Sequence, residues 1–475
     1  MGFADYVSYD GLGLAELVAK RDVQPIELVD EAIARAEAVN PKLNAVVHAD
    51  YERARAAAQA PLPEGPFRGV PFFLKDILGF AKGMPTRQGA EFMPAIPSDH
   101  DSLFTARLRN AGFIFLGKTN TPEFGLVPTT ESRLYGTCRN PWNLERSSGG
   151  SSGGSAALVA AGVVPLAHAN DGGGSIRIPA SCCGLVGLKP TRGRVSYAPE
   201  FGDTVDGLAI DLVVSRSVRD TAAALDVVAG NVQGDPYWAP PPDRYLEGIG
   251  ARPKTLRMAV ATTKSNGNPL HPDCLAAVKN AARLCEEQGH AVEEGMPELD
   301  MPALMPAFMA IWTGNLAAGI DLIAQLTGQS ATEDKFEGLT WGLYELGRQV
   351  SASQYLNAKG VLAQCGRAAA KFHERYDVWL TPTLATPPAK LGTIPMEERD
   401  PMKSFAPLAE YVPFTALQNV TGQPAINLPL SWNAEGLPIG VQFVGRFGDE
   451  LSLLQLAAQL EEAQPWRNRR PPVFR

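Results

Sequence analysis

Hydrophobic positions recur with two different periods along the chain, and these periods predict helices and strands in turn. Residues 24–40 place apolar side chains at helical spacing behind Pro25, and Asn40-Pro41 is expected to end that helix. Short runs that are apolar throughout instead predict buried strands. These runs lie at residues 70–74, 113–116, 163–168, 256–261, 377–382, 423–429 and 439–444, with a further strand beginning at 290–292.

Helical patterns separate the predicted strands. They cover residues 102–111, 155–162, 271–288 and 450–461, and most of 300–375. Strands that alternate with helices are typical of an α/β fold. We therefore expect a mixed central β-sheet covered by helices on both faces. The expected organisation is one large domain over residues 1–475, with a helical segment at 1–65, a core at about 66–230 and a variable, largely helical, substrate-side segment at about 265–375.

Composition and charge exclude several classes of protein. With 475 residues, 45% of them hydrophobic, the chain can bury a large core. Its net charge is −8 and it has no stripe of basic residues, so we expect no nucleic-acid partner. No secretory signal is recognised at the N-terminus, and no apolar run reaches the ~20 residues of a membrane span. We expect a cytoplasmic protein that does not enter a membrane.

The six cysteines show no spacing that binds metal or builds a disulfide framework. None forms a C-x-x-C pair, and Cys182 and Cys183 are adjacent. We interpret them as buried free thiols. Neither a metal nor an organic cofactor is expected.

Two motifs match well-known patterns in an unsuitable context. Gly112–Thr119 fits the phosphate-binding G-x-x-x-x-G-K-[ST], but its inner residues are themselves a predicted strand and Pro122 lies where the helix should begin. Gly150–Gly154 fits the G-x-S-x-G nucleophile elbow and would nominate Ser152. That mechanism needs a downstream histidine base, and the sequence context of the later histidines favours structural roles for them. The elbow therefore remains an unsupported alternative.

A lysine and two serines form a more specific constellation. Lys75 ends a buried strand, Ser151 lies in a glycine-rich loop, and Ser175 follows Gly172–Gly174. These segments resemble the signature of the amidase signature family. Further segments that resemble the family are Lys118–Gly125, Cys183–Thr191, Leu380–Thr383, Asn419–Ala425 and Gly436–Gln442, so the resemblance runs almost from end to end and is weakest over 235–370.

The resemblance implies a catalytic triad without histidine. Ser175 would be the nucleophile, Ser151 a proton relay that follows a cis peptide bond, and Lys75 the base. A lysine can act as a base only when neutral, and burial lowers its pKa from the usual ~10.4. The apolar strand before Lys75 makes such burial plausible. The alternative is that Lys75 forms an ion pair with a carboxylate such as that of Asp76.

The resemblance also implies how the transition state is stabilised. The N–H groups of Gly172, Gly173, Gly174 and Ser175 would form an oxyanion hole, in which one donor is worth ~3–4 kcal/mol in other hydrolases. Ser152, Asp171 and Arg177 match positions that brace the site by hydrogen bonding. The expected reaction is attack by Ser175, an acyl-enzyme and then hydrolysis by water.

The sequence indicates the substrate less clearly than it indicates the type of reaction. Many family members carry Thr or Ile at position 172 and Gln or Phe at 178, whereas this chain has Gly172 and Ile178. The segment 168–181 looks closest to the branch of 6-aminohexanoate-cyclic-dimer hydrolases, aryl acylamidases and urethanases. We therefore expect a small-molecule amide, anilide, carbamate or ester as substrate, with Ile178 and Trp312 as candidate pocket residues. An ordinary core helix is the alternative for the stretch around Trp312.

Two other functions remain as alternatives. One is the glutamine-hydrolysing subunit of a tRNA-dependent amidotransferase, which the absence of Gln at 178 disfavours. The other is an inactive scaffold of the same fold, which the intact Lys75, Ser151 and Ser175 disfavour. A homodimer is left open.

Overall fold

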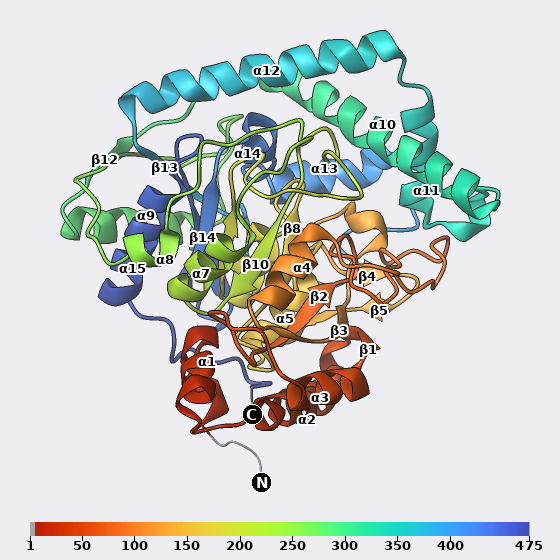
Figure 1. The fold of residues 1–475 in the computed structure, drawn as a ribbon. Helices are drawn as coiled ribbons and strands as arrows, with labels where there is room; N and C mark the ends of the chain where they lie inside the picture. The colour runs from red at the N-terminus through yellow and green to blue at the C-terminus, as the bar shows by residue number, and fades with distance from the viewer. Residues whose placement is uncertain (1–4, 475) are drawn as a thin grey trace.

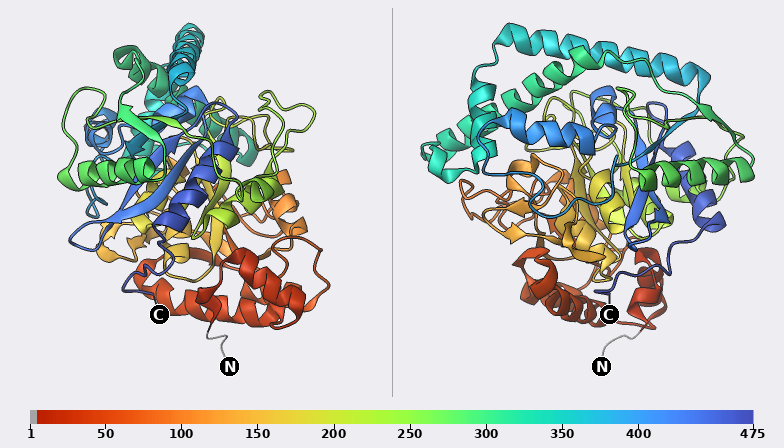
Figure 2. Two further views of the ribbon diagram at one scale, coloured as in Figure 1. Left: turned by 90° about the vertical axis from the view of Figure 1, so that its left-hand side faces the viewer. Right: turned by 180° about the vertical axis from the view of Figure 1, so that it is seen from behind.

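The computed structural model describes residues 5–474 and contains an eight-stranded mixed sheet (Figure 1). The strand order is β12-β11-β13-β15-β14-β9-β10-β8. β11 is parallel to β12 and β13, and the other neighbouring pairs are antiparallel. The strands are β8 (Leu166–Asp171), β9 (Val186–Lys189), β10 (Ile210–Ser215), β11 (Arg257–Val260), β12 (Ala291–Glu294), β13 (Val378–Pro382), β14 (Ala425–Trp432) and β15 (Pro438–Val444). Helices flank the sheet (Figure 2), which confirms the predicted α/β class.

A smaller three-stranded sheet brings the lysine strand to the edge of the large one. Its order is β1-β3-β2, with β1 (Val46–Ala49), β2 (Pro71–Lys75) and β3 (Ile114–Thr119). Every residue of β2 is buried, and β2 packs against the edge strand β8. The end of β2 therefore meets the end of β8. Two short hairpins follow, β4 (Glu131–Ser132) with β5 (Gly136–Thr137) and β6 (Arg139–Asn140) with β7 (Asn143–Ser147).

Most helices pack around the two sheets. Three of them gather at the end of the molecule opposite the long helices α10 (Met301–Thr327) and α12 (Ala352–Arg375) (Figure 1). These are α1 (Gly11–Lys20), α2 (Pro25–Leu43) and α3 (Tyr51–Gln59). The others are α4 (Leu103–Asn110), α5 (Gly153–Ala160), α6 (Arg177–Cys183), α7 (Val218–Val228), α8 (Tyr245–Gly248), α9 (Pro272–Glu287) and α15 (Glu450–Ala463), with short 3-10 turns at Tyr6–Ser8, Glu123–Gly125 and Glu333–Lys335.

A helical cap covers the end of the molecule at which β8 and β2 terminate. Its members are α10 (Met301–Thr327), α11 (Gly338–Arg348), α12 (Ala352–Arg375), α13 (Pro401–Tyr411) and α14 (Ala416–Thr421). The largely helical character predicted for 300–375 is confirmed. By length and composition alone α10 could cross a membrane, although no apolar run in the sequence predicted a span. It packs against α11 and α12, and 39% of its most apolar stretch is buried.

Two predicted boundaries are corrected. α2 continues through Pro41 to Leu43, and the proline costs it only the one N–H that Pro41 lacks. Just beyond the helix, the Asn40 side chain accepts the N–H groups of Ala45 and Val46. The strand expected at 163–168 is instead β8, which begins only after a turn at Gly162 and Pro165. The shift makes Asp171 the last residue of a strand.

Candidate active site

Lys75 ends β2 with its ammonium group inside the protein. Its side chain is fully buried, and Nζ donates to Ser151 Oγ at 2.7 Å and to Asn170 Oδ1 at 2.6 Å. Burial lowers the pKa of Lys75 to about 7, although the charges of Asp211 and Asp171 oppose this shift. Burial therefore makes the neutral form of Lys75 accessible near neutral pH.

The alternative ion pair between Lys75 and Asp76 is not formed. The Asp76 carboxylate accepts the Arg87 N–H at 2.9 Å and the Tyr135 hydroxyl at 2.8 Å. Side chains of adjacent strand residues point to opposite faces. Lys75 therefore turns toward Ser151, and Asp76 turns away from it.

Ser151 lies in a loop where glycines allow close backbone contact. The peptide bond between Gly150 and Ser151 is cis, as the family resemblance implied. A Cβ atom at Gly150 would lie 2.3 Å from Thr129 O, and one at Gly125 would lie 3.2 Å from Ser151 Oγ. Larger residues at either position would displace the loop that presents Ser151.

Ser175 follows β8 after three glycines and lies at the surface of a hollow. It is 9% exposed, and Gly173 lines the hollow beside it. A Cβ atom at Gly174 would lie 2.4 Å from Thr415 Oγ1, and the φ of this glycine is +133°. The sequence therefore requires glycine at 174 for the turn that exposes Ser175.

The expected oxyanion hole needs one correction. The N–H of Gly174 donates to Asp171 Oδ1 at 2.7 Å, so this group is already engaged inside the loop. Because a main-chain N–H carries a single proton, it cannot also serve an oxyanion at full strength. Of the four groups nominated, those of Gly172, Gly173 and Ser175 remain as candidate donors.

Asp171 and Arg177 form a fully buried clamp beneath this loop. Arg177 donates to both Asp171 carboxylate oxygens at 2.9 Å, and its other donors reach the side chains of Gln418, Asn419 and Gln442. Burial raises the pKa of Asp171, but the charges of Arg177 and Lys189 and the hydrogen bonds from Arg177 and Asn419 together outweigh it and lower the value to about 2. The clamp ties the Ser175 loop to α14.

Breaking this clamp is expected to destabilise the fold. Asp171→Asn leaves the Arg177 charge buried without a counter-ion, a change that costs about 3–5 kcal/mol in other proteins. Because folding lowers the Asp171 pKa, its stabilisation is present above the unfolded value of ~3.9 and is lost as the pH falls through about 2. Urea midpoints measure the effect. Glu247→Gln, which removes an exposed ion pair with Arg244, is the control and should leave the midpoint unchanged.

Ser152 contacts Asn170, a residue for which the sequence predicted no role. Its Oγ donates to the carbonyl of Asn170 and accepts the N–H of the same residue, both at 3.3 Å. His168, two positions earlier on β8, accepts the Lys75 N–H through Nδ1 at 3.2 Å. Polar residues at alternate positions of a buried strand were the signal that could have identified Asn170 and His168.

The hollow in front of Ser175 is largely apolar and measures about 630 Å³. It is called the substrate hollow below. α10 supplies Phe308, whose ring stacks on that of Trp312 with 5.4 Å between the ring centres, and Ile178 is also a lining residue. A Cβ atom at Gly172 would lie 3.2 Å from the Trp312 ring. Both pocket residues nominated from the sequence thus line the hollow, where Thr or Ile at 172 would push Trp312 aside.

Only one ion pair lies among the described residues that line the substrate hollow. Lys264, from the loop after β11, donates to Glu410 of α13. A site of this volume with few polar groups fits a ligand of roughly drug size with an apolar body.

The other sequence motifs have structural roles here. Residues Ile114–Thr119 of the phosphate-loop pattern form β3, and Lys118 Nζ donates to Gly79 O and Thr86 Oγ1 within the protein. All six cysteines are buried and free, as predicted. Over residues 5–474, no three His, Cys, Asp or Glu side chains gather where they could hold a metal.

Comparison with known proteins identifies the family. A family model described as Amidase matches residues 27–454. The chain belongs to the amidase signature family. It is 41% identical to the 6-aminohexanoate-cyclic-dimer hydrolase of Paenarthrobacter ureafaciens, over 98% of this chain and 97% of that protein. The chain is therefore an amidase-family hydrolase that acts on amide C–N bonds.

Solved structures agree with this assignment. A 6-aminohexanoate cyclic dimer hydrolase with bound substrate superposes with a TM-score of 0.94 at 40% identity, over 99% of this chain and all of that one. A bacterial aryl acylamidase of the family superposes with a TM-score of 0.87 at 26% identity, over 96% of both chains.

Proposed function

We propose that this amidase-family enzyme hydrolyses neutral amides, anilides and aryl carbamates through a covalent Ser175 acyl-enzyme. The observation that carries the proposal is the contact of the buried Lys75 Nζ with Ser151 Oγ at 2.7 Å, together with a Ser175 that lines an apolar hollow. A serine hydroxyl is a weak nucleophile until a base removes its proton. A neutral, buried lysine is such a base.

Protons move between Ser175 and Lys75 through Ser151, first toward Lys75 and then back. As Ser175 Oγ bonds to the carbonyl carbon, its proton passes to Ser151, and the proton of Ser151 passes to Lys75 Nζ. The C–N bond then breaks, and the same relay returns the proton to the leaving nitrogen. Water repeats the sequence on the acyl-enzyme and releases the acid and free Ser175.

The Asp171–Arg177 clamp would keep this machinery in place. The N–H groups of Gly172, Gly173 and Ser175 are the candidate donors to the developing oxyanion, and such donors help only when they are held rigidly. By fixing the loop from below, the clamp would limit its movement as the charge develops.

A matched set of substrates tests the acyl-enzyme. We would compare a benzamide, an anilide, an aryl carbamate, a p-nitrophenyl ester and glutamine, with hydroxylamine as a competing nucleophile. An amide, an anilide and an ester of one acyl group should give the same ratio of hydroxamate to acid, because they share one intermediate. Ratios that depend on the leaving group would contradict the mechanism. Turnover of glutamine alone would instead support the amidotransferase alternative.

Activity should depend on pH through Lys75. Because the base must be neutral, kcat/KM should rise tenfold per pH unit below about 7 and level off above it. Asn170→Asp places a negative charge against Nζ, which raises the pKa of Lys75 and should move the rising limb to higher pH by about one unit. The pH profiles of both proteins provide the measurement. An unmoved limb in the variant would show that another group controls the rate.

A further inference from the structure

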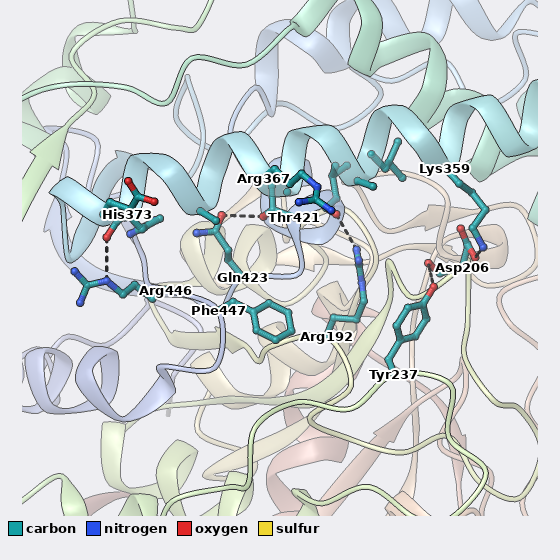
Figure 3. A pocket seen from close by; sticks show the side chains of 16 residues that line it. Arg192, Asp206, Tyr237, Lys359, Arg367, His373, Thr421, Gln423, Arg446 and Phe447 are labelled. Atoms are coloured by element: carbon teal, nitrogen blue, oxygen red, sulfur yellow. Dashed lines mark hydrogen bonds and ion pairs between the residues drawn. The ribbon is translucent and has the colours of Figure 1, made fainter.

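A second hollow lies at the C-terminal end of α14, whereas the substrate hollow lies at its N-terminal end. It measures about 870 Å³ and runs under α12 (Figure 3). The two hollows share no lining residue: Ala416 and Leu417 of α14 line the substrate hollow, whereas Val420 and Thr421 line the second. Nothing in the proposed hydrolysis uses this second space.

Positive charge predominates in the second hollow. Four of its lining residues are permanent cations at neutral pH and two are carboxylates. They are Arg192, Lys359, Arg367 and Arg446, with Asp206 and Glu374. His373 adds no charge, because burial lowers its pKa to about 4. Lys359 pairs with Asp206 at 2.8 Å, and Arg446 pairs with Asp377 outside the lining at 2.6 Å.

The remaining two guanidinium groups form no ion pair or hydrogen bond with a carboxylate among residues 5–474, although the charges of Asp206 and Asp203 act on Arg192 from a distance. Arg192 donates only to the main-chain carbonyls of Gly207, Asn419 and Val420, which carry no net charge. Arg367 makes no hydrogen bond or ion pair within that range. In Figure 3, Arg367 extends from α12 toward Thr421, the last residue of α14. Arg192 reaches the same end of α14 through the carbonyls of Asn419 and Val420. Two such groups facing one space are a site for an anion.

The rest of the lining suits an apolar body. Phe447 is 47% exposed, and its ring lies over Gly422, where a Cβ atom would be 3.1 Å away. Where α12 passes over the hollow it presents Ala363, Gly366 and Ala370, and a Cβ atom at Gly366 would have nothing within 4 Å. Small residues on the roof and an exposed ring below leave room for one flat or short aliphatic group.

We infer that the second hollow binds a small organic carboxylate, whose anionic end pairs with Arg367 and Arg192 and whose apolar body covers Phe447. The ligand class is the same as that of the acids that amide hydrolysis releases, so an acid product of the proposed reaction would fit it. α14 connects the two spaces: Arg192 donates to the Asn419 carbonyl, and the Asn419 amide donates to the Asp171 carboxylate at 2.8 Å.

Calorimetric titration with sodium benzoate tests the site. Wild type should bind benzoate saturably, more weakly as salt is added, and should not bind the neutral benzamide in the same way. Arg367→Ala should raise the dissociation constant for benzoate about tenfold, the equivalent of ~1.4 kcal/mol for one charge-assisted contact. Ala370→Trp should remove binding by filling the space. Lys371→Ala removes a charge from the same helix outside the hollow and should bind as wild type does.

The outcomes separate this site from the catalytic one. Hydrolysis of the p-nitrophenyl ester without benzoate is followed in parallel, and Arg367→Ala should leave it unchanged because Arg367 does not line the substrate hollow. Benzoate binding that survives both Arg367→Ala and Ala370→Trp would overturn the proposal, as would no saturable binding by wild type. Binding of inorganic phosphate with no binding of benzoate would show a bare anion site and refute the organic ligand. None of these results depends on whether Ser175 is the nucleophile.

Discussion

Ser175→Ala should lower kcat for amide hydrolysis by about 10⁵–10⁶-fold, the scale seen when other serine hydrolases lose their nucleophile. Without the Ser175 hydroxyl no acyl-enzyme can form, and the remaining groups can only orient the substrate and polarise its carbonyl. Release of aniline from an aryl anilide measures the loss. KM should change little, because the apolar walls of the substrate hollow remain.

A control variant keeps this result interpretable. Ser353→Ala makes the same chemical change on the exposed face of α12 and should leave kcat unaltered. Both variants should unfold at the temperature of wild type, since Ser175 lies at the surface of the substrate hollow rather than in a packed core. If Ser175→Ala retained more than a hundredth of wild-type kcat, the assignment of the nucleophile would be wrong.

Replacing Lys75 should have the second-largest effect. Lys75→Ala removes the base and should lower kcat about 10⁴-fold. Lys75→Arg should be nearly as inactive, because a guanidinium has a pKa above 12 and does not give up its proton to act as a base. Small primary amines added to Lys75→Ala should restore part of the rate, and more of it as the pH rises. Initial rates across pH measure both effects.

Lys118 provides a matched comparison for Lys75. It is equally buried, on the neighbouring strand β3, and burial lowers its pKa to about 8. Its Nζ donates to Gly79 O and Thr86 Oγ1 and has no hydrogen bond to Ser151 or Ser175. Lys118→Met should therefore lower the free energy of unfolding but keep kcat within about tenfold of wild type. Equal losses of kcat in the two lysine variants would indicate a structural role for Lys75.

The sequence nominated the proposed triad but not the residues that support it. Lys75, Ser151 and Ser175 stand in short motifs whose residue types are unusual, and the structure brings Lys75 and Ser151 into contact. The contact of Asn170 with Lys75 was not predicted, because it exists only where β2 packs against β8, and these two strands lie far apart in the chain. A short sequence motif does not show which distant segment it will contact in the fold.

The substrate hollow shows the same limit. Trp312 was nominated from an apolar stretch, but α13 was not predicted at all, because Pro407 interrupts its pattern. Lys264 and Glu410 could not be paired from the sequence, since they meet only when the loop after β11 and α13 fold over one space. The Gly174 N–H was assigned to the oxyanion hole because the motif cannot show that Asp171 already accepts it.

Most walls of the substrate hollow come from one stretch of chain, residues 301–417, whereas the proposed triad comes from residues 75–175. Most of the residues that face the substrate are thus encoded apart from those of the proposed triad, although Ile178 and the Thr415 contact with Gly173 cross this division. Mutagenesis confined to the codons of the later stretch that encode wall residues, with Thr415 kept, should retune which compounds are accepted without disturbing bond cleavage. Exchange of that stretch between homologues would be a single-step route to new specificities, in the laboratory as in evolution.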